Sequence, residues 1–591
     1  MNVRNLTLLM SAGLLLLACQ ERAVVDLRGK IKEGSDITKV IRKTVASLPK
    51  KDAKIILPKG TFKLLSTEML SKSLKITNHD NGDRRIAFNL EGFDGITVEG
   101  DSTTLLFEGA AMPFRVSKSN RVTIKGINID WEKPYFIQGE IIATDTVNLT
   151  CDIRFSRKGY DFKYQDGDIL FPNQPELNYK GLGQRLLWNM DRRSPAYKSS
   201  HFDFKFADDG NIEKISADVY RLKAAKGRCP KVGLWMTFKG KNGVNRYAPA
   251  FHVINTDQIR LEDVHVYHAL GMGFLAEKSS NITLNRFKVM PSPGTNRLIS
   301  ATADATHYCN CKGDVLMQDC VFENMLDDGT NVHGTYMYID KVLDDHTLEA
   351  SFEHFQQEGF AFAEAGDKTW FELTPDITRG HENVVHAYKP LNDKQVQIQF
   401  ENPLPKNLKK GDLVENKTWN TATFTMDGCI VRHHRARNVV LKTPGVNVIK
   451  NCYFESMMAS ILLRAEAFHW YESGANENVT IKNNTFVNCT YGGGDQAVLY
   501  ISPKLNKSFD QNQIVDKDIH FVGNKIESFD NRIVLAEHVD GLEIRDNVIT
   551  LNADFPIFNP LVPLFDLVGC KAVTCENNQV TGRKAEWLGQ R

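Results

Sequence analysis

The residues that could do chemistry gather in one short stretch, residues 325–334, which holds Asp327, Asp328, Asn331 and His333. A surface turn can carry Asp-Asp-Gly at little cost, so the stretch alone indicates no more than a solvated turn. A third carboxylate, Asp304, lies about 23 residues upstream of Asp327, within the range of repeat lengths found in coiled folds. If the chain coils with a repeat of that length, the three carboxylates lie on neighbouring coils, about 4.8 Å apart along the axis.

Three carboxylates on one face repel each other, and none of the three has a basic neighbour in the sequence. Their repulsion raises the pKa of at least one member and can supply a protonated acid. Inverting glycoside hydrolysis needs such an acid, together with one or two carboxylates that hold a water, with acid and base about 6.5–9.5 Å apart. The cluster therefore favours the hydrolysis of glycosidic bonds.

A coiled repeat would bring these residues together, and the sequence predicts one. Its unit is a short apolar strand, a turn at Gly, Asn or Asp, and a second apolar stretch, as in residues 122–129 and 259–266. Equivalent positions form the pairs Leu261 and Leu284, Leu284 and Met317, Ile449 and Ile481, Phe521 and Ile544, and Ile544 and Cys575. Their separations of roughly 23–33 residues, with alternating apolar strands and no helical stretches between them, are typical of β-helix coils.

We therefore expect an all-β fold, a right-handed parallel β-helix with two inserted small β-barrel-like domains. A helix from Asp36, capped by Ser35, and the strand that follows it resemble the N-terminal cap of such a β-helix. A cap is needed because the first coil exposes an apolar end and an unpaired strand edge. The pairs Asn483-Asn484, Asp546-Asn547 and Asn577-Asn578 suit tight turns with positive φ.

The coil pattern is lost twice, and this defines the expected domains. The two interruptions are long enough to be small β-domains hung from loops of the solenoid, where binding surfaces are built. The expected organisation is a lipoprotein signal peptide (1–18), an N-terminal cap with the first coils (19–136), a first inserted domain (137–245), coils with the catalytic aspartates (246–334), a second inserted domain (335–421) and C-terminal coils (422–591).

The start of the chain predicts export. Arg4 precedes an apolar run that is too short to span a bilayer as a helix and reads as a signal peptide. Leu16-Leu17-Ala18-Cys19 resembles a bacterial lipobox, in which the signal is cut before a cysteine that is then lipidated. We expect a protein anchored to a bacterial membrane in the cell envelope through acyl chains on Cys19.

Composition excludes some partners. With 73 basic and 72 acidic residues, nothing favours nucleic acid or an acidic membrane surface. Ten cysteines follow Cys19; an exported protein could pair them, but Cys320, Cys452 and Cys575 fall inside apolar strand patterns, where a thiol behaves as a small core residue. Neither Cys309-Asn310-Cys311 nor His433-His434 has further ligands at suitable spacing, so no metal site is expected.

The polygalacturonases, which are also β-helices, use a similar set: an Asp, then Asp-Asp about one coil later, then His-Gly. More specifically, Asp304 with residues 326–334, on a lipobox-bearing β-helix with two inserts, resembles glycoside hydrolase family 110. That family contains bacterial exo-acting α-1,3-galactosidases that invert the anomeric carbon. The resemblance covers nearly the whole mature chain. It implies a terminal α-1,3-linked galactose as substrate, as in blood group B or the linear α-1,3-galactosyl epitope, and it implies no cofactor. By analogy with the polygalacturonases, Asp327 is the acid, and Asp304 and Asp328 hold and deprotonate the water.

Further residues that could bind the sugar follow from stacking the coils. Aligning Cys429 with Cys320 places Arg437 one coil above Asp328 and Lys442 above His333; aligning Cys452 places Arg464 near Val332. Solvated loop positions are an equally good interpretation of both arginines. A tryptophan can stack on galactose, or simply pack a loop. The candidate substrate-binding residues are Asn331, His333, Arg437, Lys442, Arg464, Glu466, Trp470, Arg297 and His307.

Two other functions remain open from the sequence. A β-helix can be a polysaccharide lyase, with the aspartates as Ca²⁺ ligands, which calcium dependence would reveal. It can also be a non-catalytic surface protein that binds glycans, whose function Asp327→Asn would leave intact. The inserts are candidates for a homodimer interface.

Overall fold

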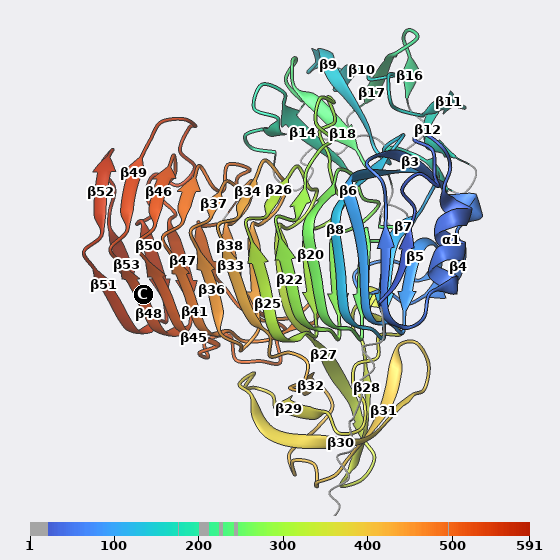
Figure 1. The fold of residues 1–591 in the computed structure, drawn as a ribbon. Coiled ribbons are helices and arrows are strands. Elements are labelled where there is room, and N and C mark those ends of the chain that lie inside the picture. Colours follow the sequence, from blue (N-terminus) through green and yellow to red (C-terminus); the bar gives the residue numbers. More distant parts are fainter. Residues whose placement is uncertain are drawn as a thin grey trace, which may run out of the picture.

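The computed structural model describes residues 22–174, 177–199, 212–223, 229–240, 246–494 and 496–590. Its body is a parallel β-helix in which coils with three strand-bearing faces stack from the N-terminal to the C-terminal end (Figure 1). The predicted fold class is confirmed. The predicted signal peptide and Cys19 lie outside the described residues. Among the described helices, none is long and apolar enough to cross a bilayer.

Each face is a ladder of parallel strands. The first contains β1 (Ala23–Asp26), β2 (Lys51–Ile56), β6 (Asp94–Glu108), β8 (Asn120–Trp131), β20 (Asp257–Val266), β22 (Ser280–Asn285), β25 (Lys312–Gln318), β33 (Thr423–Asp427), β36 (Asn447–Lys450), β41 (Glu477–Lys482), β45 (Asp516–Val522), β48 (Val539–Arg545) and β51 (Lys571–Glu576). The second contains β3 (Gly60–Leu65), the later parts of β6, β8 and β20, then β23 (Lys288–Val289), β26 (Val321–Glu323), β34 (Ile430–Arg432), β37 (Tyr453–Phe454), β42 (Thr485–Val487), β46 (Lys525–Ser528), β49 (Val548–Leu551) and β52 (Gln579–Gly582).

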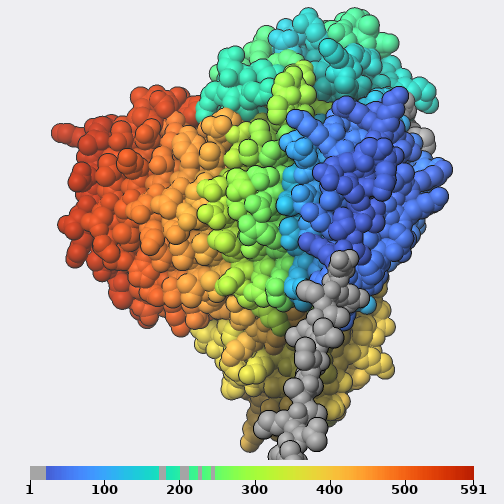
Figure 2. All heavy atoms as spheres, viewed as in Figure 1, coloured from blue at the N-terminus to red at the C-terminus, as the bar shows by residue number. Residues whose placement is uncertain are grey.

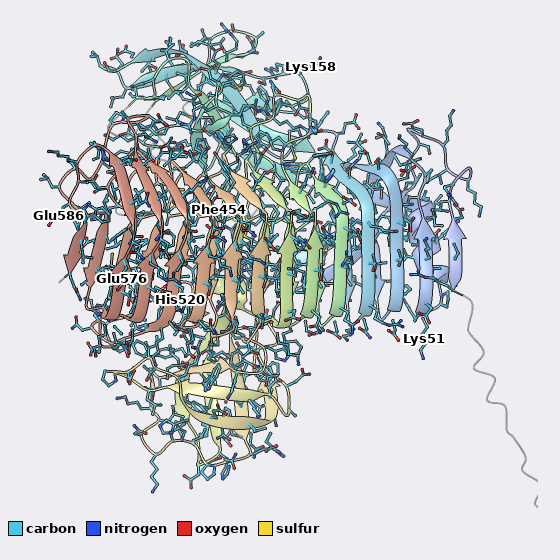
Figure 3. All side chains as sticks on the ribbon, turned by 60° about the vertical axis from the view of Figure 1, so that its left-hand side comes forward. Lys51, Lys158, Phe454, His520, Glu576 and Glu586 are labelled. Atoms are coloured by element: carbon cyan, nitrogen blue, oxygen red, sulfur yellow. The ribbon has the colours of Figure 1, made fainter. Side chains whose placement is uncertain are left out.

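The third face carries the site described below. Its strands are β5 (Gly82–Glu91), β7 (Met112–Ser117), β19 (Phe251–Ile254), β21 (Phe274–Glu277), β24 (Thr306–Cys309), β27 (Thr330–Val342), β35 (Val439–Lys442), β38 (Ile461–Leu463), β43 (Leu499–Ile501), β47 (Val534–Glu537), β50 (Phe565–Val568) and β53 (Leu588–Gln590), with β4 (Leu70–Leu74) antiparallel to β5. In Figure 3, Lys51 on β2 and Glu576 on β51 lie at opposite ends of the stack.

The register predicted from the apolar pattern is correct at every ladder pair that the sequence named. The five pairs given above, Leu261 with Leu284 through Ile544 with Cys575, are direct neighbours on adjacent coils. The inward residues of the three faces form one continuous hydrophobic core, in which Phe114 stacks on Phe88 with ring centroids 4.5 Å apart.

The two residues of each turn pair have different structural roles. The first member of each pair, Asn483, Asp546 and Asn577, has positive φ, as predicted. The second members form a buried ladder that the sequence did not predict, with Asn524 between Asn484 and Asn547. The Asn524 side-chain oxygen accepts both the backbone N–H and the side-chain amide of Asn484, at 3.0 and 3.1 Å. One asparagine per coil thus ties each turn to the next.

The cysteines belong to the core. All ten cysteines of the described residues are free, and eight of them are buried. Cys320, Cys429 and Cys452 stack on successive coils, where each following sulfur accepts a backbone N–H at 3.4 Å. Because they are buried, these thiols pack as small apolar core residues, as the strand pattern of Cys320 and Cys452 indicated.

The N-terminal end is covered by α1 (Thr38–Ser47), which buries Ile41 and Val45 against the first coil (Figure 1). The helix begins two residues later than predicted. Asp36, rather than Ser35, supplies the local acceptor, because its Oδ1 takes the backbone N–H of Thr38 at 2.9 Å. η1 (Ser66–Glu68) follows β3.

The first insert is an antiparallel domain that leaves the solenoid at β9. Its seven-stranded sheet contains β15 (Ser194–Pro195), β14 (Arg185–Asn189), β18 (Trp235–Phe238), β9 (Ile137–Asp145), β10 (Thr150–Phe155), β17 (Val219–Lys223) and β16 (Glu213–Lys214), and a second sheet contains β11 (Lys163–Gln165), β12 (Asp168–Gln174) and β13 (Leu177–Lys180). A second hydrophobic cluster holds the domain together and joins it to the solenoid through residues such as Leu298 and Leu326. Figure 2 shows it as the teal mass opposite the yellow second insert.

The second insert is a closed six-stranded antiparallel barrel. In order around the barrel its strands are β27, β28 (Thr347–Ser351), β31 (Gln395–Phe400), β30 (Gly380–Pro390), β29 (Lys368–Glu372) and β32 (Leu413–Asn416), which returns to β27. β27 belongs to both units: residues 330–333 pair in the third face and residues 336–342 pair in the barrel. The predicted boundary between residues 334 and 335 therefore falls inside one continuous strand.

Candidate active site

The third face places its polar residues by strand alternation. In β24 and β27, Thr306, Thr330 and Val332 point into the core, so the residues between them point outward. His307 and Asn331 are neighbours on adjacent coils and both line the same cavity. The aspartates stand just before these strands, at the edge where the chain turns onto the third face.

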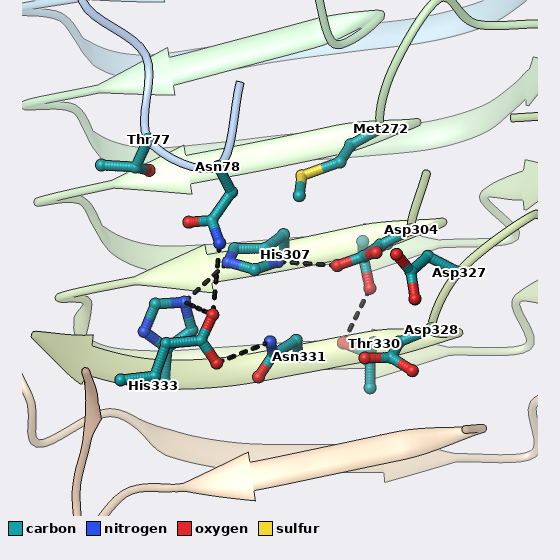
Figure 4. A network of polar contacts seen from close by, with 12 residues as sticks. Thr77, Asn78, Met272, Asp304, His307, Asp327, Asp328, Thr330, Asn331 and His333 are labelled. Carbon is teal, nitrogen blue, oxygen red and sulfur yellow. Dashed lines mark hydrogen bonds and ion pairs between the residues drawn. The ribbon is translucent and has the colours of Figure 1, made fainter. Parts of the chain in front are cut away.

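The three aspartates meet at this edge (Figure 4). One carboxylate oxygen from each of Asp304, Asp327 and Asp328 lies within 4.8 Å of the others. The register places Asp304 beside Asp328, because Thr306 pairs with Thr330. The prediction that Asp304 lies close to the Asp327-Asp328 pair is confirmed, with Asp328 rather than Asp327 as its direct neighbour in the register.

Gly329 lies in the bend that leads from the aspartates into β27, and its φ is not positive. A Cβ atom at this position would lie 2.4 Å from the backbone oxygen of Asn438 on the next coil. Glycine is required here because two coils approach closely directly beside the aspartates.

Asp327 is held by two arginines. Arg246 Nη2 lies 2.5 Å from Oδ2, and Arg435 Nη1 lies 3.0 Å from Oδ1. Burial opposes the charge of Asp327, but Arg435 and Arg246 outweigh it and hold its pKa well below the usual range. These two ion pairs favour the ionised form of Asp327, whereas the role predicted for it, that of the general acid, requires a proton.

Asp304 and Asp328 behave differently from Asp327. Burial, reinforced by the neighbouring Asp327 charge, raises the pKa of Asp304 to about 7. Burial raises the pKa of Asp328 to about 7 as well, against the pull of Arg437. Their partners distinguish them. Both oxygens of Asp328 accept from Arg437, at 3.0 Å from the backbone N–H and 2.9 Å from Nη2, which suits an ionised carboxylate.

A buried ion pair forms the wall beside the aspartates. Lys442, beside His333 in the ladder as predicted, bonds to Glu472 on β40 (Glu472–Ser473). The Glu472 carboxylate also accepts from the side-chain amides of Asn78 at 3.2 Å and Asn331 at 3.3 Å. Asn331 therefore serves to orient Glu472, and its own oxygen has no partner among the described residues.

The resulting cavity has a volume of about 660 Å³. Ten of the predicted residues line it: Asp304, Asp327, Asp328, Asn331, Arg437, Lys442, Arg464, Glu466, Trp470 and His307. The sequence missed other lining residues, including Asn78, Arg246, Arg435, Phe468, Glu472, Tyr500 and Lys504. Arg435 could have been found, since it stands two residues before Arg437. Asn78 and Arg246 come from distant segments and carry no local signal.

One rim of the cavity is a loop organised by Glu466. Its carboxylate accepts the backbone N–H groups of Phe468, His469 and Trp470, at 3.0, 2.6 and 2.5 Å. β39 (Glu466–Ala467) is fixed in turn by pairing with β44 (Lys504–Leu505). Glu466 thus shapes the site through its loop, whereas direct binding of the sugar was predicted.

Three other predicted residues lie differently from expectation. Arg464 follows β38 in the column of Lys442 and His333, one position beyond Val332, and donates to the Ser502 carbonyl at 2.8 Å. Arg297 does not reach the cavity: it bonds to Asp130 at 2.7 Å and is buried, so its predicted role in substrate binding is wrong. His333 lies behind the cavity wall.

Trp470 keeps an exposed part at the rim. Its ring packs against His354 of the second insert, with centroids 4.3 Å apart. Gln357, from the same insert in η3 (Phe355–Gln357), donates to the Trp470 carbonyl at 2.8 Å. The second insert therefore supports the loop that carries the aromatic rim.

Two groups of side chains could in principle ligate a cation within the described residues, the three aspartates and the set of His307, His333 and Glu472. At the first group, a cation would have to displace Arg246 and Arg435 from Asp327. At the second, the Lys442 ammonium already neutralises Glu472. Both groups suit proton chemistry better than metal binding.

Both inserts match known family models. Residues 137–236 match the model for GLAA-B β-barrel domain I, and residues 347–414 match that for GLAA-B β-barrel domain II. The chain is 28% identical over 535 residues to alpha-1,3-galactosidase A of Shewanella woodyi, covering 90% of this chain and 86% of that protein. It is 28% identical over 583 residues to alpha-1,3-galactosidase B of Phocaeicola vulgatus, covering 94% and 91%.

Among solved structures, the chain is similar to the family 28 exopolygalacturonase of Yersinia enterocolitica, with a TM-score of 0.34, 10% identity, and coverage of 94% of this chain and 79% of that one. The strand ladders above define the fold independently of that match. The curated relatives, which the chain matches over about nine-tenths of its length, support a glycoside hydrolase.

Proposed function

We propose that this protein is an exo-acting α-1,3-galactosidase that removes terminal α-1,3-linked galactose from glycans, such as blood group B or linear α-1,3-galactosyl epitopes, with inversion. The observation that carries the proposal is the group of three carboxylates within 4.8 Å of one another at a cavity of about 660 Å³. Sites for small ligands have volumes of ~300–1,000 Å³. The names of the relatives supply the linkage.

The three carboxylates divide the chemistry by their partners. Asp304 enters the reaction protonated and gives its proton to the leaving glycosidic oxygen. Asp327 and Asp328, ionised beside their arginines, hold the attacking water and take its proton. Because one water can bridge two oxygens ~5.5 Å apart through two hydrogen bonds, the close spacing allows this arrangement. In this arrangement all three carboxylates have a role, whereas a retaining mechanism needs only two of them.

The close spacing of the carboxylates makes a retaining mechanism the second candidate. Retaining enzymes place their two carboxyl groups ~5–5.5 Å apart, and inverting enzymes ~6.5–9.5 Å apart. Retention would make one of the ionised aspartates a nucleophile. The anomer released first distinguishes the two mechanisms.

The first experiment is galactose release from α-1,3-, α-1,4- and α-1,6-linked galactosides, followed by NMR. Initial β-galactose from the α-1,3 compounds alone is the expected result. Initial α-galactose would establish retention, and no galactose from any compound would refute the galactosidase. Uronate polymers with and without calcium would then test a lyase.

Variants assign the roles. Asp304→Asn should lose ~10²–10⁴-fold in kcat with an alkyl galactoside, and much less with a dinitrophenyl galactoside, whose leaving group needs no acid. Asp327→Asn and Asp328→Asn should lose activity with both substrates. Asp540→Asn, at an exposed position of β48, is the matched control and should retain full activity. Leaving-group dependence in Asp327→Asn instead would return the acid role to Asp327.

We also propose that the protein is exported and anchored through lipidated Cys19, on the sequence pattern given above. Cells labelled with a fatty acid should yield labelled protein in the membrane fraction. Cys19→Ala should abolish the label. A labelled Cys19→Ala variant would contradict the assignment.

A further inference from the structure

A line of hydrogen bonds runs from Asp304 into the interior behind the cavity wall (Figure 4). Asp304 Oδ2 lies 2.7 Å from His307 Nδ1, and His307 Nε2 lies 2.7 Å from His333 Nε2. The line ends at the carbonyl of Gly334, 2.6 Å from His333 Nδ1. All three side chains belong to buried residues that are at most 3% exposed. The reaction proposed above makes no use of the two histidines.

The end of the line fixes the direction of every bond in it. A carbonyl oxygen only accepts, so His333 Nδ1 carries a hydrogen. A neutral imidazole has one N–H, so His333 Nε2 accepts, and His307 Nε2 must donate to it. His307 Nδ1 is then an acceptor. The hydrogen between His307 and Asp304 therefore belongs to the carboxyl group.

Both imidazoles must be neutral for these directions to hold. Burial lowers the pKa of His307 to about 4 and that of His333 to about 3. The nearest buried carboxylate, Glu472, is 3.7 Å from His333 but is already paired with Lys442. No imidazolium is needed to balance its charge.

Other charged groups also face Asp304 and His307. Asp327 and Asp328 disfavour an ionised Asp304, whereas Arg246 and Arg437 favour it. Further groups reach these side chains from the neighbouring strands and loops: Lys239, Glu277, Lys442 and Glu472. Because both signs are present, the electrostatic field alone does not place the proton. The hydrogen-bond line does.

We propose that His307 and His333 are positioning residues that hold one proton on Asp304 in the free protein. The line supplies an acceptor that the neutral carboxyl group satisfies and the carboxylate does not. Hydrogen bonding to the neutral form disfavours ionisation. This assignment rests on the proposed function only for its kinetic consequence. The protonation pattern stands on the hydrogen-bond geometry.

The first test reads the tautomers directly. Long-range ¹H–¹⁵N spectra of the protein labelled at histidine should show Nε2–H for His307 and Nδ1–H for His333, with His333→Gln and His307→Gln assigning the signals. Two N–H groups on His307, or Nδ1–H on His307, would overturn the proposal. So would a stoichiometric transition metal in the purified protein, since the facing Nε2 atoms would then be its ligands.

The second test is kinetic. His333→Leu removes the acceptor of His307 Nε2–H, so His307 can adopt the Nδ1–H tautomer and donate to the Asp304 carboxylate. The alkaline limb of kcat/KM should then move to lower pH by about one unit. His333→Gln offers an amide oxygen in place of Nε2 and should keep the wild-type limb. A shift to higher pH, or equal shifts in both variants, would refute the proposal.

The two tests separate two failures. If no galactoside is cleaved, the proposed function fails, and the spectra still decide where the proton lies. Circular dichroism of each variant shows whether it folds. If His333→Leu does not fold, the wild-type spectra and His333→Gln still test the direction of the hydrogen bonds between Asp304 and His333.

Discussion

Removing the ammonium of Lys442 should destabilise the protein more than removing one partner of an exposed ion pair. Lys442 and Glu472 have side chains that are each 4% exposed. Lys442→Met keeps the length of the side chain and leaves the Glu472 carboxylate with only neutral donors nearby. Breaking a buried ion pair by removing one partner costs ~3–5 kcal/mol, because a charge is left buried without a counter-charge.

That free energy converts into a measurable shift in melting temperature. Unfolding entropy of about 2.1 cal/mol/K per residue gives roughly 1.2 kcal/mol/K for a chain of 591 residues. If the whole chain unfolds together, a loss of about 4 kcal/mol lowers Tm by ~3 °C. Differential scanning fluorimetry resolves this shift. A smaller cooperative unit would show a proportionally larger one.

A double-mutant cycle identifies the cause. Glu472→Gln keeps an oxygen acceptor for one of the two amides, Asn78 or Asn331, and removes the charge. The variant with Lys442→Met and Glu472→Gln together should recover most of the lost stability, with a coupling of at least ~2 kcal/mol. Lys39→Met, which breaks the exposed pair with Glu68, is the control and should cost ~0–1 kcal/mol. Additive effects of the Lys442 and Glu472 changes would refute the reasoning.

Three further predictions follow from the same structure. Because Asp304 must be protonated and its pKa is raised to about 7, kcat/KM should fall as pH rises through 7; a pH–rate profile flat to pH 9 would contradict this. Glu466→Ala should raise KM for oligosaccharides about tenfold, equal to ~1.4 kcal/mol of loop ordering, and an unchanged KM would show that the loop needs no such anchor. Asn524→Leu should cost about 1–3 kcal/mol for each buried donor of Asn484 that it leaves without an acceptor, measured by thermal unfolding beside an exposed control, Asp540→Asn.

The repeat could be predicted because burial imposes it. An inward position must be apolar on every coil, so Leu261, Leu284 and Met317 are visible as one column in the sequence. The same logic brought Asp304 close to the Asp327-Asp328 pair. It missed their exact register by one residue, since turn length is set by backbone conformation rather than by burial.

Arg464 lies near Val332, as predicted, but one position beyond it, and this offset has the same origin. From Val431 to Val439 the chain takes eight steps, but from Phe454 to Ile461, the equivalent positions one coil on, it takes seven. An alignment anchored at Cys452 therefore shifts everything after the turn. Arg246 had no such signal, because it reaches Asp327 from a segment that follows the first insert.

The protonation of the aspartates could not be predicted from their spacing. Like charges in a cluster require one raised pKa, but they do not say which residue has it. That depends on Arg246 and Arg435 at Asp327, and on His307 at Asp304. These partners come from the three-dimensional arrangement of the coils.

The passage of β27 from the third face into the barrel has a consequence for how the chain folds. Most neighbouring coils are formed by segments that lie close together in the sequence, as where Cys429 meets Cys452, so each coil can close soon after the last. At the second insert this changes: Cys320 meets Cys429, 109 residues later. Closing that gap has a larger loop-entropy cost, so we expect it to follow the formation of the barrel. Arg435 and Arg437 face Asp327 and Asp328 across this seam. We therefore expect the carboxylate site to be completed late in folding. A chain stalled at the seam should be a half-solenoid with an open sheet edge, prone to aggregate and without activity.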